Sequence, residues 1–113
     1  MHKLESYRKI IKEVLTRYHQ LSNADTQPNI EDLLAFDEKQ DNYFWFRSGW
    51  DGNKRVSTII IFLRLKNDKI WVEEDWTDLC VVDYLLEAGV PKTDIVLAFH
   101  PPSKRKFTKF AIA

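Results

Sequence analysis

The three histidines are the first residues to examine for chemistry, because imidazole titrates near neutral pH and binds metals. They are His2, His19 and His100, and no two of them have the spacing of a metal-binding pair. His100 is the catalytic candidate. We favour the alternative for His100, a rigid His-Pro-Pro turn with a structural hydrogen bond, because no companion nucleophile or carboxylate accompanies it. The histidines therefore predict neither catalysis nor a metal site.

An acidic run, Glu73, Glu74 and Asp75, followed by Asp78, could ligate Mg²⁺ or serve in acid–base catalysis. A solvated strand end and the cap of a following helix explain the same residues more simply. Cys80 is the single cysteine and falls in the first turn of that helix, where we interpret it as a small buried apolar residue. The three glycines of the chain form no Gly-rich phosphate cradle. We expect a protein that is not an enzyme and has no cofactor and no metal.

Basic residues gather in a C-terminal tail, residues 100–113. The tail holds Lys104, Arg105, Lys106 and Lys109, and no acidic residue. The remaining 13 of the 17 basic residues share the rest of the chain with all 17 acidic ones. Beside Phe107 and Phe110, the basic side chains could contact phosphates while the rings stack on bases. They could equally contact an acidic protein surface.

Apolar residues spaced three and four apart predict a helix over residues 4–21. They are Leu4, Tyr7, Ile11, Val14, Tyr18 and Leu21. A second helix is predicted over 78–88, with Thr77 as its N-terminal cap and Gly89 at its end. A short buried strand over 95–99 follows, and the tail after it is irregular.

Four strands are predicted over 33–38, 43–50, 56–65 and 69–75 from their β-branched and aromatic residues. Asp51-Gly52 between the second and third strands matches a two-residue type I′ hairpin turn, and Asn67-Asp68 marks the next turn. A loop over 22–29 precedes the first strand. The four strands should form an antiparallel meander.

The turn at Asp51-Gly52 sets a register that divides the strand side chains between two faces. Directly opposed residues share a face, and one face then collects an apolar core: Phe44, Phe46, Ile59, Ile61, Leu63, Leu65, Ile70 and Val72. The other face carries large side chains among charges: Tyr43, Trp45, Ile60, Phe62 and Trp71. Because Tyr, Trp and Arg dominate interface hot spots, we interpret these five as a candidate partner-binding surface. It would serve another protein or a homo-oligomer; burial under a further layer is the alternative.

A chain of 113 residues suffices for one domain, which we predict to span 1–113. The expected fold class is α+β, with the N-terminal helix and the second helix packed on one face of the meander and a short C-terminal strand. The formal net charge of zero argues against nucleic-acid binding over the whole surface. A lone cysteine, no apolar signal core in the first residues and no membrane-length apolar run lead us to expect a cytoplasmic protein.

Beyond these patterns, the chain resembles the XisI family, the fdxN element excision controlling factors of cyanobacteria. The resemblance spans nearly the whole chain, and six segments carry it: LESYRKII at 4–11, GWDGNKR at 49–55, DKIWV at 68–72, LEAGVPK at 86–92, DIVLAFHPP at 94–102 and KRKFTKFA at 104–111. Their combined order and spacing make the match specific, although no single segment is a catalytic signature.

The resemblance implies a regulatory role in programmed DNA excision. In heterocyst-forming cyanobacteria, the XisF site-specific recombinase removes the fdxN element, and XisH and XisI are needed to control it. XisI-like proteins are commonly encoded beside XisH-like proteins, which resemble restriction-endonuclease folds. An XisH-like protein is therefore the partner that the resemblance implies, with direct DNA contact through the basic tail as the alternative.

Overall fold

The computed structural model describes residues 2–22 and 28–113, so most of the loop predicted over 22–29 lies outside the described residues. Along the chain the elements are α1 (His2–Ser22), β1 (Ile30–Asp37), β2 (Asn42–Asp51), β3 (Lys54–Lys66), β4 (Lys69–Asp75), α2 (Val81–Glu87), the 3₁₀ helix η2 (Lys92–Asp94), β5 (Ile95–Leu97) and α3 (Pro102–Arg105). Each predicted helix and strand occurs. The strand over 69–75 has the predicted bounds, and the ends of the others are shifted.

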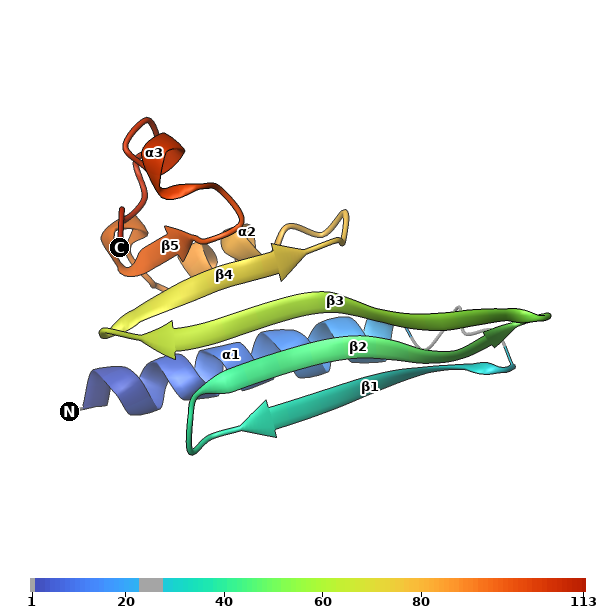
Figure 1. The fold of residues 1–113 in the computed structure, drawn as a ribbon. Coiled ribbons are helices and arrows are strands. Elements are labelled where there is room, and N and C mark those ends of the chain that lie inside the picture. The colour runs from blue at the N-terminus through green and yellow to red at the C-terminus, as the bar shows by residue number, and fades with distance from the viewer. Residues whose placement is uncertain (1, 23–27) are drawn as a thin grey trace.

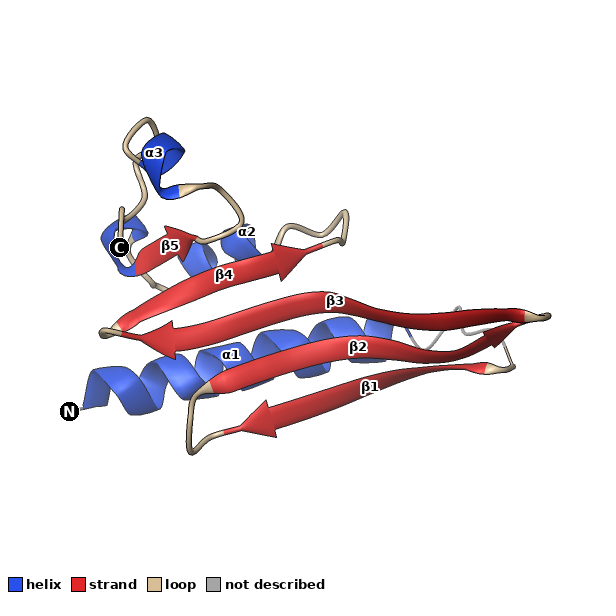
Figure 2. Ribbon diagram, in the orientation of Figure 1, coloured by secondary structure: helices blue, strands red, loops and turns tan. Residues whose placement is uncertain are grey.

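The five strands form one open sheet in the order β1-β2-β3-β4-β5. Strands β1 to β4 are antiparallel neighbours, and β5 pairs with β4 in parallel. Helices α1 and α2 both lie behind the sheet in the view of Figure 1, and Figure 2 shows the same layering by secondary structure. The predicted α+β fold class is confirmed.

Helix α1 packs its apolar stripe onto the sheet. Ile11, Val14 and Leu15 are fully withdrawn from solvent, and Tyr7 and Tyr18 are buried beside them. Residues three and four apart lie on the same side of a helix, so one face of α1 supplies all five side chains. The core that they join also contains side chains of α2 and of strands β2 to β5.

Polar contacts at both borders of α1 fix its position along the sheet. Arg8 donates two hydrogen bonds to the Asp41 carboxylate, at 2.8 and 3.0 Å. On the other side the Tyr7 hydroxyl donates to Asp94 at 2.5 Å, and the Lys3 ammonium lies 2.9 Å from the same carboxylate. These contacts join the first helix to the β1–β2 turn and to the segment just before β5.

The turn between β2 and β3 is formed by Gly52 and Asn53, one residue later than predicted, because Asp51 pairs with Lys54. Gly52 has a φ of +62°, the positive value that the first position of a type II′ turn requires. A two-residue turn moved by one residue leaves each side chain on its original face. The turn itself therefore did not disturb the predicted faces.

A β-bulge beyond this turn did disturb them. Phe46 lies opposite Ile59. The preceding residue of β2, Trp45, lies opposite Ile61, so Ile60 is an extra residue in β3. One extra residue reverses which face the rest of the paired strand presents.

The predicted core was therefore right for β4 and for β3 beyond the bulge, and wrong for β2 and for Ile59 of β3. Five predicted core residues are buried: Ile61, Leu63, Leu65, Ile70 and Val72. Phe44, Phe46 and Ile59 are half-buried on the opposite face of the sheet. Tyr43 and Trp45 take the predicted core positions of β2 beneath α1.

The connection from β4 to α2 is organised by Asp75. Its carboxylate accepts hydrogen bonds from the Thr77 backbone nitrogen at 2.9 Å, the Thr77 hydroxyl at 2.6 Å and the Val81 backbone nitrogen at 2.8 Å. Asp75 therefore binds a backbone nitrogen at the start of α2. The N-cap residue is Cys80, so the prediction of Thr77 as the cap was wrong. Cys80 precedes the helix with a φ of 52° and is exposed, so its predicted burial was also wrong.

Candidate interaction surfaces

The sheet face turned away from α1 and α2 is lined by apolar side chains from three strands. We call it the open face: Leu33, Ala35, Phe44, Phe46, Ile59 and Phe62. The rings of Phe44 and Phe62 stack with centroids 4.3 Å apart and an interplanar angle of 19°. Apart from the exposed Ala35, these side chains are half-buried, which leaves an apolar surface without a helix packed on it.

The predicted partner-binding residues do not share one surface. Tyr43, Trp45 and Ile60 belong to the buried core, with exposures of 0%, 3% and 8%. Phe62 lies on the open face, and Trp71 is buried at its far end. The bulge at Ile60 is the physical cause, since it moves the aromatic residues of β2 from one face to the other.

Trp71 is covered by basic side chains instead of a partner. The Lys66 ammonium and the Arg105 guanidinium lie 4.8 and 5.5 Å from the centre of its ring. Arg105 also donates to the carbonyl oxygen of His100 at 3.0 Å, and to those of Ala98 and Ile112 at 3.4 Å. Arg105, one of the four basic tail residues, therefore holds the tail onto the sheet.

The other predicted basic residues of the tail face solvent. Lys104, Lys106 and Lys109 are exposed, and so are the apolar side chains of Phe107 and Ile112. The backbone of the tail returns to the sheet at Ala111, which donates to the Ile95 carbonyl oxygen at 2.9 Å. An anchored backbone thus presents three lysines and two large apolar side chains outward.

Two grooves meet at Trp76, in the connection between β4 and α2. One has a volume of about 400 Å³ and includes Glu74, Cys80 and Phe99 in its lining. The other, of about 420 Å³, runs between the end of α1 and this connection, past Leu21 and Leu79. Trp76 lines both grooves and is 74% exposed. Large apolar side chains therefore stay accessible beside acidic ones.

The sequence interpretation missed this surface. The acidic run was interpreted as a strand end and a helix cap, and Asp75 does accept a hydrogen bond from the Val81 backbone nitrogen at the start of α2. The pattern that could have revealed it is charge segregation: residues 73–91 contain six acidic residues and no Lys or Arg. Trp76 and Leu79 interrupt that acidic stretch with exposed apolar side chains.

A buried carboxylate organises the wall of the second groove. Asp32 accepts hydrogen bonds from the Arg47 guanidinium at 2.7 Å, the Ser22 hydroxyl at 2.9 Å and the Trp45 indole at 3.1 Å. Burial alone would raise the pKa of Asp32, but these three hydrogen bonds together hold that pKa below its usual value. Asp32 thus stays charged and fixes Arg47 and Trp45, which line the groove.

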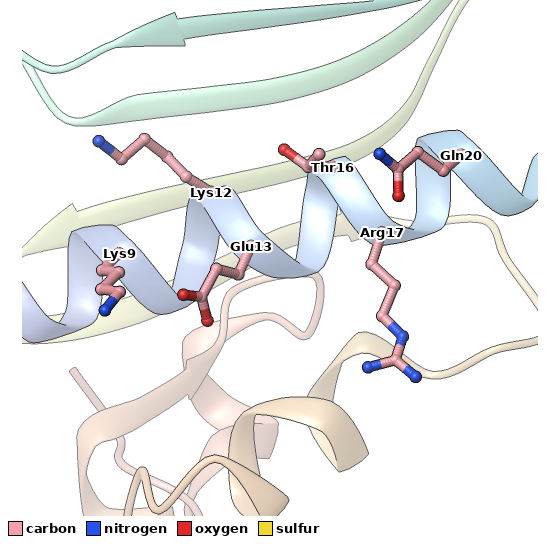
Figure 3. Close-up of a pocket in the computed structure, with 6 residues that line it drawn as sticks. All are labelled: Lys9, Lys12, Glu13, Thr16, Arg17 and Gln20. Atoms are coloured by element: carbon pink, nitrogen blue, oxygen red, sulfur yellow. The ribbon is translucent and has the colours of Figure 1, made fainter.

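A hollow of about 570 Å³ runs along the solvent side of α1. Its lining comes from one helix alone: Lys9, Lys12, Glu13, Thr16, Arg17 and Gln20 (Figure 3). Lys12 pairs with Glu38 at 2.8 Å, and the Arg17 guanidinium lies 6.0 Å from the centre of the Tyr84 ring. With two of its three cations, Lys12 and Arg17, directed to neighbouring elements, the hollow is a space between protruding side chains.

His100 lies in a turn at the start of the tail. Its backbone nitrogen donates to the Leu97 carbonyl oxygen at 3.0 Å, and its own carbonyl oxygen accepts the bond from Arg105. The centre of its ring lies 4.6 Å from the centre of the Phe99 ring. Within residues 2–22 and 28–113, no cluster of three or more His, Cys, Asp or Glu side chains could hold a metal ion. Over the same residues, no helix has the length and apolar character to cross a membrane.

The architecture defines a small α+β protein whose helices cover one face of an open sheet. Its exposed apolar side chains lie on the other sheet face, beside acidic residues at the Trp76 grooves and beside lysines in the tail. The family model for the XisI protein matches residues 1–112. The chain therefore belongs to the XisI family. Among curated proteins, none matches the chain significantly.

Two solved structures from Anabaena variabilis ATCC 29413 are similar to this chain. The crystal structure of fdxN element excision controlling factor XisI is 49% identical over 98% of this chain and 99% of that one, with a TM-score of 0.85. The crystal structure of a XisI-like protein is 33% identical over 97% of this chain and 99% of that one, with a TM-score of 0.91. The family and these relatives support a role in the control of excision.

Proposed function

We propose that this protein is a non-enzymatic accessory factor that controls programmed excision of a DNA element by binding an XisH-like partner. The observation that carries the proposal is the 49% identity to a fdxN element excision controlling factor over nearly the full length of both chains. Such a factor acts in the cytoplasm, where the recombining DNA lies, and works through contact with other proteins.

We further propose that the XisH-like partner docks on the open face. This surface retains Phe62 from the predicted binding residues and adds the aromatic rings of Phe44 and Phe46. Half-buried aromatic side chains lose their remaining contact with water when a partner covers them, and each can contribute about 1–3 kcal/mol to binding. The charged Arg64 and Glu73 side chains, 3.5 Å apart, lie beside them.

The test is co-purification of this chain with the XisH-like protein encoded beside its gene, followed by calorimetric titration of the two. We expect a stable complex that Ile59→Glu weakens at least tenfold, because a carboxylate would be buried against the partner. Thr58→Glu is the matched control, since it adds the same charge to the same strand on the opposite face. Two proteins that stay separate at micromolar concentrations would disprove the partnership. Equal effects of the two variants would disprove the docking face.

The exposed lysines of the tail favour a second candidate function, direct binding to DNA. Lys104, Lys106 and Lys109 can each neutralise one phosphate. Three such contacts predict a salt dependence with a slope of about −3 in a plot of log K against log salt. Binding to duplex DNA at low salt, lost when the three lysines become Ala, would support this function. No measurable binding at low salt would eliminate it.

A further inference from the structure

The charges of this neutral chain are divided between two neighbouring surfaces. Residues 73–91 hold six acidic residues and no basic one, and residues 100–113 hold four basic residues and no acidic one. Phe99 lines the groove beside Trp76 and immediately precedes the tail. Oppositely charged surfaces are therefore adjacent on the same molecule.

The acidic surface also carries large exposed apolar side chains. We call it the Trp76 surface: Leu21, Glu74, Trp76, Asp78, Leu79 and Phe99. The four apolar members are 57%, 74%, 50% and 50% exposed for Leu21, Trp76, Leu79 and Phe99. The neighbouring Glu73 and Asp75 are paired within the molecule. Glu74, which accepts one hydrogen bond from the Trp76 indole, and Asp78 lie at the grooves themselves.

The tail has the complementary composition. Phe107 is 81% exposed and lies between Lys106 and Lys109, and Ile112 is 56% exposed. The molecule's own tail does not fill the grooves, because no residue after Phe99 lines either of them. Arg105 on Trp71 and Ala111 on β5 hold the tail where it is. A second molecule can place the side chains of its own tail in these grooves.

We propose that two copies of this chain form a two-fold symmetric dimer, in which the tail of each copy packs on the Trp76 surface of the other. Phe107 enters a groove beside Trp76, and Lys106 and Lys109 face Glu74 and Asp78. Because the tail and the Trp76 surface lie next to each other on one molecule, each copy can place its tail on the other copy and receive the other's tail. A two-fold axis requires such a reciprocal contact. The proposal does not depend on the XisH-like partner.

The test measures the mass of the purified chain by light scattering and sedimentation at micromolar concentrations. We expect a dimer whose affinity falls with added salt, because charge pairs at an interface rim are screened. A double variant of the acidic surface, Glu74→Lys with Asp78→Lys, and one of the tail, Lys106→Glu with Lys109→Glu, should each raise the dimer dissociation constant at least tenfold.

Mixing the two double variants provides the decisive measurement. The reversed acidic surface now attracts the reversed tail, and the two unchanged surfaces still attract each other, so a heterodimer should form although neither variant pairs with itself. Circular dichroism confirms that each variant is folded. Lys39→Glu with Lys54→Glu, two exposed lysines elsewhere, is the charge-matched control and should leave the dimer intact.

Three results would overturn the proposal. The first is a wild-type chain that stays monomeric. This result overturns the proposal even where Glu74→Lys with Asp78→Lys weakens a complex with another protein. The second is a dimer that either double variant leaves unchanged. The third is a mixture of the two variants that contains only monomers.

Discussion

Asp32 is a carboxylate that the fold removes from water without neutralising it. Its side chain is 4% exposed, and it accepts hydrogen bonds from three side chains on α1 and β2. A buried charge is tolerated only when donors replace the lost water. The carboxylate therefore locks the end of α1 to the aromatic core.

We expect Asp32→Asn to lower the free energy of unfolding by about 1–3 kcal/mol at neutral pH, because Arg47 loses its charged acceptor. Urea denaturation measures this difference, with the exposed Asp51→Asn as control. The pKa of Asp32 is lowered in the folded state, so its contribution is present above 3.8 and is lost as pH falls through the lowered value. Variant and wild type should therefore converge in acid. A constant difference down to about pH 2 would contradict this assignment.

Gly49 is required where β2 passes β1. A Cβ atom at this position would lie 2.1 Å from the Asn29 carbonyl oxygen, and its φ is +155°. We expect Gly49→Ala to cost about 3 kcal/mol in denaturant unfolding, from backbone strain together with overpacking. Gly52→Ala meets no neighbouring atom and should cost about 1–2 kcal/mol, from its φ of +62° alone. Equal costs at the two glycines would show that the contact with Asn29 relaxes freely.

Among the elements, the C-terminal tail is held at Ala111 by its backbone and elsewhere by the side chain of Arg105. Arg105 donates to three backbone carbonyl oxygens along the tail and packs on Trp71, which is buried. Lysine carries the same charge but lacks the planar fork that reaches several acceptors at once. The order of the tail is therefore tied to a guanidinium group.

We expect Arg105→Ala to increase amide hydrogen exchange over residues 106–113 by at least tenfold while leaving α1 and β3 unchanged. Arg105→Lys should restore little of the protection, because an ammonium cannot make all three hydrogen bonds. Mass-spectrometric exchange measures both variants. Lys104→Ala, an exposed neighbour, is the control. Unchanged exchange in Arg105→Ala would mean that the Ala111 backbone contacts hold the tail without it.

The elements of the sheet could be predicted because their determinants are local. Apolar spacing predicts α1, and β-branched and aromatic runs predict the strands. The bulge at Ile60 has no comparable local pattern, since Ile59, Ile60 and Ile61 are identical residues and only pairing decides which is extra. The parallel pairing of β5 with β4 depends on contacts between residues 25 positions apart, such as Ile70 and Ile95. Such pairings leave no trace in either segment alone.

For the candidate surfaces, too, local patterns could be predicted from the sequence and contacts between distant residues could not. Charge segregation along the chain could be read from the sequence, and it predicted the basic tail. The sequence could not show that Arg105 turns inward while its lysine neighbours turn outward, because this difference arises from the position of Trp71. The five predicted docking residues do not share one face for the same reason that part of the predicted core was misplaced: one bulge moved Tyr43 and Trp45 beneath α1.

At the scale of the whole molecule, carboxylates hold the layers together. The hydrogen bonds from Arg8 hold the pKa of Asp41 below its usual value. Burial would raise the pKa of Asp94, but the hydrogen bonds from Tyr7 and Lys3 outweigh burial and lower it. Both residues anchor α1. We expect the free energy of unfolding to fall as pH drops below 3.8, where these carboxylates become protonated in the unfolded chain, until pH passes their lowered pKa values in the folded protein. Urea midpoints across a pH series measure this loss, and Asp41→Asn should flatten it. A midpoint that is constant down to about pH 2 would contradict it.

The contact between Tyr7 and Asp94 joins residues 87 positions apart. On the ribosome, α1 therefore emerges well before its anchor at Asp94. The hairpins between can close as they emerge, because their contacts are local. The apolar side of α1, by contrast, has no complete sheet to cover until β4 and β5 have been synthesised. Nascent chains of this protein should thus keep that helix available to chaperones until β4 and β5 have emerged, and only then can α1 reach its native packing.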